Sequence, residues 1–363
     1  MMPKSQDNSA PIPQATIDKC VNEYEIEDIT IEQVLWLSQV LRAISKSDLG
    51  KDFALMGGSA IVFLYRNLYR FSTDLDLDFV GNKNLGCGGK NEIIKQFEND
   101  HGKLREVAKS LGMVLKFGAN IKSMDQAVKN RFIQYVLEYP SQYSSSSNSV
   151  EIDLSYRYCH SVLEPVIKPW PIVVDQLIPA FSVQTLSLEE LFAGKIIAIL
   201  KGKTMKRLDF SGSIGLLFKR KIRHLYDTFL LADDVLNKRI MIDLKLLKSL
   251  ILLFGVSRIS DFGLYRGDSI VAYEEQDKID ELSPVVPSTI PLPSVKEIQW
   301  TVRKFLDLYI FHFSKKDYEF IEDFSAKIFR PQKIFPASIA QRIKDAFYYK
   351  EILEKIQPLR DAE

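Results

Sequence analysis

Three carboxylates recur at every second position in the segment 71–79, which reads FSTDLDLDF. Side chains alternate between the two faces of a β-strand, so this spacing predicts that Asp74, Asp76 and Asp78 project from one face. Three neighbouring negative charges repel one another and favour a bound cation. Mg²⁺ binds through one or two carboxylates together with phosphate oxygens, and metal ions can clamp a phosphoryl displacement. The pattern therefore predicts a magnesium site for phosphoryl chemistry, with a solvated edge strand as the alternative.

A glycine-rich turn precedes this strand. Gly57, Gly58 and Ser59 follow the short apolar run FALM and stand where a strand is expected to pass into a helix. Glycine lets the backbone approach a ligand closely, and the amides at a helix N-terminus attract phosphate. A Gly-Gly pair also makes an ordinary tight turn. The succession of a glycine-serine turn, a helix and an Asp-x-Asp strand nevertheless predicts a phosphate cradle beside the metal site.

A further carboxylate lies on another expected strand, VEIDLSY at 150–156. Asp153 shares a strand face with Glu151 and Ser155. Taken alone, it would be an ordinary exposed acid. Beside a two-carboxylate metal site, Asp153 is a candidate third ligand, or the base that takes the proton of an attacking hydroxyl.

The elements that position these residues form an α+β half followed by a helical half. Alternating and periodic apolar residues predict strands at 53–56, 74–80, 114–117, 132–139 and 150–156, and helices at 59–69 and 91–111. A T-x-x-Q capping box predicts a helix from Thr30 to Ser47. The proline-punctuated stretch 165–179 is expected to be extended and irregular. Helical periods then predict helices at 188–200, 221–236, 241–254, 295–313 and 337–356. We expect one domain over 1–186, with 1–13 flexible, and a helical domain over 187–363.

Five segments occur in a characteristic order: GGSA, RFSTDLDLDF, EIDLS, LEELFAGKIIAIL and RHLYDTFLL. Together they resemble the AbiEii/AbiGii toxin family, nucleotidyltransferases of the DNA polymerase β-like superfamily, over residues 53–231. The resemblance implies a nucleotidyltransferase-type mixed sheet with flanking helices, followed by a mostly helical domain. It also implies Mg²⁺-dependent transfer of a nucleotide from an NTP. Related toxins add nucleotides to the acceptor end of tRNA and are restrained by a cognate antitoxin.

The resemblance also assigns roles to the acidic strand and to the turn. Gly58 and Ser59 match the family's glycine-serine motif, and Gly57 belongs to the same turn. Asp74 and Asp76 match its metal-binding pair, and Asp78 would be auxiliary. These assignments agree with the chemistry expected from the residue types alone.

The resemblance singles out two further residues, and the residue type of Arg70 suggests a role for a third. Lys195 falls on the lysine of the LEELFAGK helix and would bind triphosphate oxygens, although alone it would read as a surface lysine. Asp227 falls on the second aspartate of the family's RDLYDL-like helix. Where the family has an aspartate after the arginine, this chain has His224 after Arg223. Without the resemblance, Asp227 would be interpreted as an acid on a helix surface. Arg70 would bind phosphate or pair with a nearby aspartate.

The overall charge is nearly balanced, because 48 Lys and Arg residues oppose 47 Asp and Glu residues in a chain of 363. This balance excludes a strongly basic nucleic-acid coat protein and an acidic disordered chain. The segment from Lys195 to Arg223, called the basic segment below, is locally basic and contains a single acid, Asp209. Its cations favour contact with RNA, with a solvated lysine-rich loop as the alternative: Lys195, Lys201, Lys203, Lys206, Arg207, Lys219, Arg220, Lys221 and Arg223.

Other features bear on location and on rival functions. Three dispersed cysteines and four scattered histidines show no disulfide or zinc pattern, and no signal peptide or membrane span is evident, so we expect a cytoplasmic protein. The sequence with its resemblance thus predicts a Mg²⁺-dependent nucleotidyltransferase toxin that modifies tRNA and has an antitoxin partner. The rivals are a nucleotidyltransferase acting on a small molecule such as an antibiotic, which needs no basic segment, and a catalytically silent NTP-binding protein.

Overall fold

The computed structural model describes residues 11–66, 68–80, 90–118, 127, 132–143, 148–156, 164–201, 222–256 and 284–310. The backbone divides into two compact units. Unit 1 comprises Met1–Ser187 and Ser283–Pro291, and unit 2 comprises Leu188–Leu282 and Leu292–Glu363. The return of residues 283–291 to unit 1 has no counterpart in the sequence pattern. The helix expected at 337–356 and most of the basic segment lie outside the described residues.

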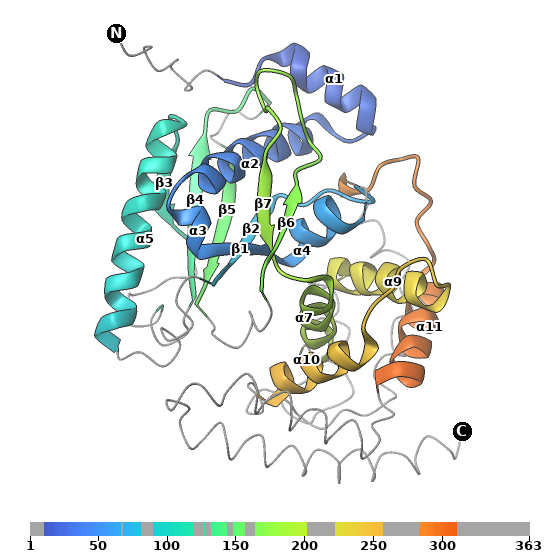
Figure 1. The fold of residues 1–363 in the computed structure, drawn as a ribbon. Coiled ribbons are helices and arrows are strands. Elements are labelled where there is room, and N and C mark those ends of the chain that lie inside the picture. The colour runs from blue at the N-terminus through green and yellow to red at the C-terminus, as the bar shows by residue number, and fades with distance from the viewer. Residues whose placement is uncertain are drawn as a thin grey trace, which may run out of the picture. The chain divides into compact units, whose positions relative to one another are not determined.

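Unit 1 is built on a mixed sheet whose seven described strands run in the order β3-β4-β5-β2-β1-β7-β6 (Figure 1). Within it, β2 is parallel to β5 and β1 is parallel to β7, and the other neighbours are antiparallel. The predicted α+β class is therefore confirmed. The strands span Phe53–Met56 (β1), Asp74–Phe79 (β2), Val114–Phe117 (β3), Phe132–Tyr139 (β4), Asn148–Ser155 (β5), Val166–Pro169 (β6) and Ser182–Thr185 (β7).

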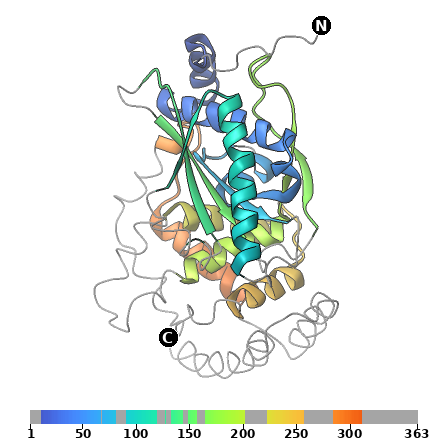
Figure 2. The same cartoon turned by 90° about the vertical axis from the view of Figure 1, so that its left-hand side faces the viewer.

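Helices cover the apolar face of this sheet. Helix α2 (Asp28–Lys46) contacts β2, β5 and β7, and α5 (Lys90–Ser110) contacts α2 and β3. Figure 2 shows α5 lying across the strands. The residues between the acids of β2, Leu75 and Leu77, are at most 2% exposed on this side, as are Ile152 and Leu154 of β5. Burial of this apolar face drives the sheet to form and leaves the acids on the opposite face. Helix α1 (Gln14–Tyr24) packs on α2, and the short α3 (Leu49–Asp52) leads into β1.

The start of α2 differs from the predicted capping box. The helix begins at Asp28 after Glu27, and the Thr30 side chain is buried. Its hydroxyl lies 3.4 Å from the carbonyl oxygen of Pro284, in the segment that returns to unit 1. A tertiary partner far along the chain thus replaces the local cap that the T-x-x-Q pattern predicts.

The proline-punctuated stretch was expected to be extended and irregular, and the expected irregularity is wrong for Val166–Pro169, which forms β6. Pro169 ends that strand, and β6 is the last strand on its side of the described sheet. Proline lacks an N–H for the strand ladder, so a sheet tolerates it at an edge or a strand end. Strand β7 was missed as well, because four residues with only two buried give little periodic signal.

Unit 2 is helical in its described residues, as the sequence predicts. Helices α9 (Ile222–Leu236) and α10 (Leu244–Val256) both contact α7 (Leu188–Lys201). Helix α11 (Val295–Phe305) packs on α9 and continues as the π-helix η7 (Leu306–Ile310). Phe192 of α7 stacks on Phe305, with ring centroids 5.1 Å apart.

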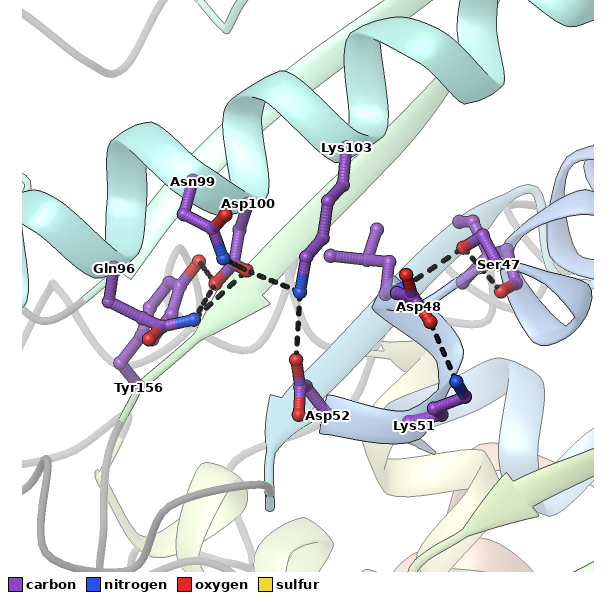
Figure 3. A network of polar contacts seen from close by, with 11 residues as sticks. Ser47, Asp48, Lys51, Asp52, Gln96, Asn99, Asp100, Lys103 and Tyr156 are labelled. Atoms are coloured by element: carbon purple, nitrogen blue, oxygen red, sulfur yellow. Dashed lines mark hydrogen bonds and ion pairs between the residues drawn. The ribbon is translucent and has the colours of Figure 1, made fainter.

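A buried polar network ties α5 to the end of β5 and to α3 (Figure 3). Asp100 of α5 is 0% exposed. It accepts hydrogen bonds from the Tyr156 hydroxyl at 2.9 Å and from Gln96 at 3.0 Å. Lys103 lies 3.7 Å from Asp100 and 2.9 Å from Asp52, which directly precedes β1. Burial raises the pKa of Asp100, so its ionised form depends on these donors.

Removing one donor tests the strength of this network. We expect Tyr156→Phe to lower the free energy of unfolding by about 1–3 kcal/mol, because a buried carboxylate then loses a hydrogen bond. Tyr135→Phe is a matched control, since the buried Tyr135 hydroxyl has no hydrogen-bond partner in the described part of the chain. Urea denaturation measures both. Equal stability of the two variants would contradict this role for the network.

Candidate active site

The glycine turn lies directly against the second acid of β2. Gly57 has φ +72°, which favours glycine, and it opens the short helical turn α4 (Gly57–Ser59). A Cβ atom added at Gly57 would lie 1.8 Å from Oδ2 of Asp76. The absence of a side chain at Gly57 therefore lets the Asp76 carboxylate lie against the turn backbone. After the turn, the predicted helix 59–69 is a π-helix, η1 (Ala60–Tyr65), which ends at Tyr65.

Two serines fix the first acid of β2. Ser59 is fully buried, and its hydroxyl donates to the backbone carbonyl of Asp74. Ser72 donates from its hydroxyl to Oδ1 of Asp74 at 2.6 Å. Ser59 thus joins the turn to the start of the acidic strand, which is a positioning contact. Gly58 is buried in the same turn.

The three acids of β2 share a face, and their exposure falls along the strand. Asp74 is exposed, Asp76 is half-buried, and Asp78 is 0% exposed. Strand β2 lies between β1 and β5, so the alternative of a solvated edge strand is wrong. In the described residues, no three His, Cys, Asp or Glu side chains gather closely enough to hold a metal ion. Of the three acids of β2, Asp74 and Asp76 are the ones accessible to a ligand.

Register brings Asp153 to this pair. Asp153 on β5 is the cross-strand partner of Asp76 on β2, and Glu151 is the partner of Asp74. The pKa of Asp153 is raised from 3.8 to about 6, chiefly by burial; a hydrogen bond with Gln134 lowers it, and the charges of Asp74 and Glu151 add to the rise. Its Oδ1 atom is buried and has no hydrogen-bond partner in the described part of the chain. Asp153 can therefore change protonation near neutral pH.

Gln134 is a site residue that sequence reasoning missed. It lies on β4 as the cross-strand partner of Asp153. Its Nε2 is 3.4 Å from Oε2 of Glu151. A Cβ added at Gly118 would lie 2.5 Å from the Gln134 side chain, so Gly118 leaves room for it. The signal was absent from the sequence because the position of Gln134 depends on the register between β4 and β5.

The raised pKa of Asp153 predicts a stability effect with a definite sign. A folded-state pKa above the unfolded value means that stability is lost as pH rises through about 4 to 6. At pH 8, Asp153→Asn should therefore have a free energy of unfolding higher than that of the parent, by on the order of 1–3 kcal/mol. It should also unfold at a higher temperature. The difference should vanish below about pH 4, where both side chains are uncharged. Calorimetry at the two pH values measures it, and a less stable variant at pH 8 would contradict the assignment.

In unit 2, α7 and α9 bring together two residues that the resemblance singled out. Nζ of Lys195 lies 2.6 Å from Oδ2 of Asp227, and the two side chains are 7% and 0% exposed. Nδ1 of His224 lies 3.4 Å from the same Nζ atom. The alternatives of a surface lysine and a surface acid are wrong, because both groups are buried in one ion pair. Helical periodicity alone did not show this pairing.

Arg70 is nearly buried, at 2% exposure, and its Nη1 donates to the carbonyl of Phe71 at 2.8 Å. The Phe71 amide in turn donates to the carbonyl of Val285 at 2.6 Å. Arg70 thus lies where the chain enters β2 beside the returning segment. Its predicted phosphate contact stays a prediction.

Comparison with known proteins places this geometry in a family. Residues 39–291 match the family described as nucleotidyl transferase AbiEii toxin, type IV toxin–antitoxin system. Among solved structures, JHP933 from Helicobacter pylori is similar at 15% identity and a TM-score of 0.42, over 85% of this chain and 100% of that chain. A second solved structure, described as that of a nucleotidyltransferase from H. pylori, is similar at 13% identity and a TM-score of 0.39, over 82% of this chain and 98% of that chain. No curated protein sequence matches the chain.

None of the helices in the described part of the chain is long and apolar enough to cross a membrane.

The family match covers the glycine turn, the acidic strand and both helices of the Lys195–Asp227 pair. It confirms the resemblance drawn from the ordered motifs. This chain belongs to the AbiEii family of type IV toxin–antitoxin nucleotidyltransferases, and it is a nucleotidyltransferase.

Proposed function

We propose that this nucleotidyltransferase transfers a nucleotide from an NTP to a hydroxyl of tRNA in a Mg²⁺-dependent reaction, as a toxin restrained by an antitoxin. The observation that carries the proposal is the contact between the Asp76 carboxylate and Gly57, whose added Cβ would lie 1.8 Å from Oδ2. It brings a phosphate-type turn and an acidic strand together. Such an arrangement suits a triphosphate bound with a metal ion.

The donors present fit Mg²⁺. Asp74 and Asp76 offer only oxygen ligands, and Mg²⁺ is typically held by one or two carboxylates together with substrate phosphates. The fully buried Asp78 would support them from within the strand. When bound, the ion would neutralise negative charge on the phosphates. Gly57 and Gly58 would place backbone against the triphosphate, and Ser59 would hold the turn on β2 through its bond to Asp74.

The protein's own groups then account for the proton and the leaving group. The acceptor hydroxyl attacks the α-phosphorus, a new phosphorus–oxygen bond forms, and pyrophosphate leaves with the electrons of the broken bond. Asp153, with a pKa of about 6, is mostly ionised at neutral pH and would take the hydroxyl proton. Asp227 is the alternative base. Lys195 would bind triphosphate oxygens, the role that the family resemblance implies for it.

Two considerations favour RNA over a small molecule as acceptor. The family belongs to toxin–antitoxin systems, and the basic segment of this chain would suit a polyanion. Neutralising Lys206, Arg207, Lys219 and Arg220 together should weaken tRNA binding and flatten its dependence on salt, because fewer counterions are released. Filter binding at several salt concentrations measures both. Unchanged affinity and slope would favour a small-molecule acceptor.

Incubation with Mg²⁺, each labelled NTP in turn and total tRNA tests the proposal as a whole. We expect label from at least one NTP to enter tRNA. Label that remains in small products would favour the small-molecule alternative. A protein that binds NTP and transfers nothing with any acceptor would be the silent binder. Co-expression with a cognate antitoxin tests the proposed partner, which should relieve growth arrest by the toxin.

A further inference from the structure

A histidine with no assigned role, His224, lies beside the buried ion pair Lys195–Asp227 of unit 2. His224 lies three residues before Asp227 on α9, so the two side chains are neighbours on one helix face. Both approach the amine of Lys195 from α7, at 3.4 Å from Nδ1 and 2.6 Å from Oδ2. The Thr228 hydroxyl donates to the His224 carbonyl at 2.8 Å within the same helix.

The contact between the Lys195 ammonium and Nδ1 of His224 determines which ring nitrogen of His224 carries the proton. A lysine ammonium has three donors and no acceptor, so Nδ1 of His224 must offer its lone pair. In a neutral imidazole the remaining proton then lies on Nε2. A doubly protonated ring would instead place a second cation 3.4 Å from the Lys195 ammonium.

We propose that His224 is a positioning residue which, as the neutral Nε2–H tautomer, accepts a hydrogen bond from Lys195 and with Asp227 fixes the direction of the lysine amine. Two of the three ammonium donors then face these acceptors. An amine held in this way would serve the triphosphate-binding role that the resemblance implies for Lys195. This last role rests on the proposed function, whereas the tautomer does not.

Side-chain substitutions separate positioning from packing. Asparagine carries its Oδ1 near the place of Nδ1 and cannot become a cation, so His224→Asn should keep nucleotide transfer within about threefold of the parent. His224→Leu fills similar space without an acceptor and should lower kcat by about tenfold to a hundredfold. His101→Asn in unit 1 is the matched control and should leave transfer unchanged.

Nitrogen NMR of the histidine-labelled full chain gives a readout independent of activity. The imidazole signal that disappears in His224→Asn should be that of an Nε2–H tautomer. A His224 ring protonated on Nδ1, or transfer by His224→Leu equal to that of the parent, would overturn the proposal. If the parent transfers no nucleotide, the proposed function fails while the tautomer still decides this inference. If His224→Leu does not fold, the tautomer and the activity of His224→Asn decide it.

Discussion

Replacing Gly57 with alanine is expected to lower nucleotide transfer by at least about a hundredfold, since a misplacement of about 1 Å at a reacting centre has an effect of that size. The new Cβ would lie 1.8 Å from Oδ2 and 2.6 Å from Cγ of Asp76, so the carboxylate must move. The φ of +72° at Gly57 also disfavours any L side chain. The variant therefore displaces the Asp76 carboxylate, a proposed Mg²⁺ ligand, without changing any acid. Steady-state transfer kinetics measure the loss.

A second glycine of unit 1 is the control for this variant. Gly102 lies within α5, and a Cβ added there meets no atom within 4 Å. Gly102→Ala should keep full activity and raise the free energy of unfolding by about 0.5–1 kcal/mol, because alanine is the better helix former. Full activity of Gly57→Ala would show that the Asp76 carboxylate does not need its observed place.

The second large effect concerns the pair Lys195–Asp227. Lys195→Met should lower the free energy of unfolding by about 3–5 kcal/mol, because it leaves the fully buried Asp227 carboxylate without its cation. Asp227→Leu should have a similar cost. The double variant should recover most of the lost stability, since a well-packed apolar pair often replaces a buried ion pair at no net cost.

Activity separates a catalytic from a structural role for this pair. If Lys195 binds the triphosphate and Asp227 supports the reaction, the double variant should be stable and inactive. Denaturant unfolding and transfer assays on the same four proteins complete the cycle. A stable and active double variant would limit the pair to folding. A double variant as unstable as the singles would instead show that the pair is not replaceable by packing.

The acidic strand and the turn could be predicted from the sequence because their signals are local. Alternation in FSTDLDLDF specifies the shared face of Asp74 and Asp76, and β1, β3 and β4 begin and end where their apolar patterns predict. Gly57 and Gly58, which precede the helix expected at 59–69, likewise predict a turn. The fold class and the family followed from the order of such local signals.

The remaining features depend on tertiary contacts that leave no local pattern. Gln134 reaches Asp153 only through the register of β4 on β5. The burial of Asp227 depends on how α7 packs on α9. The Thr30 hydroxyl contacts the carbonyl oxygen of Pro284 and does not cap its helix. The two residues are more than two hundred and fifty positions apart, so a local sequence pattern cannot predict their contact.

One measurement tests the central claim most directly, that the acids of β2 support nucleotidyl transfer. The parent chain and Asp76→Asn are incubated with Mg²⁺, tRNA and an NTP labelled either at the α- or at the γ-phosphate. We predict that only the α-label enters tRNA, that the γ-label leaves as pyrophosphate, and that Asp76→Asn transfers neither. Entry of the γ-label into tRNA, or transfer by Asp76→Asn at the parent rate, would contradict it.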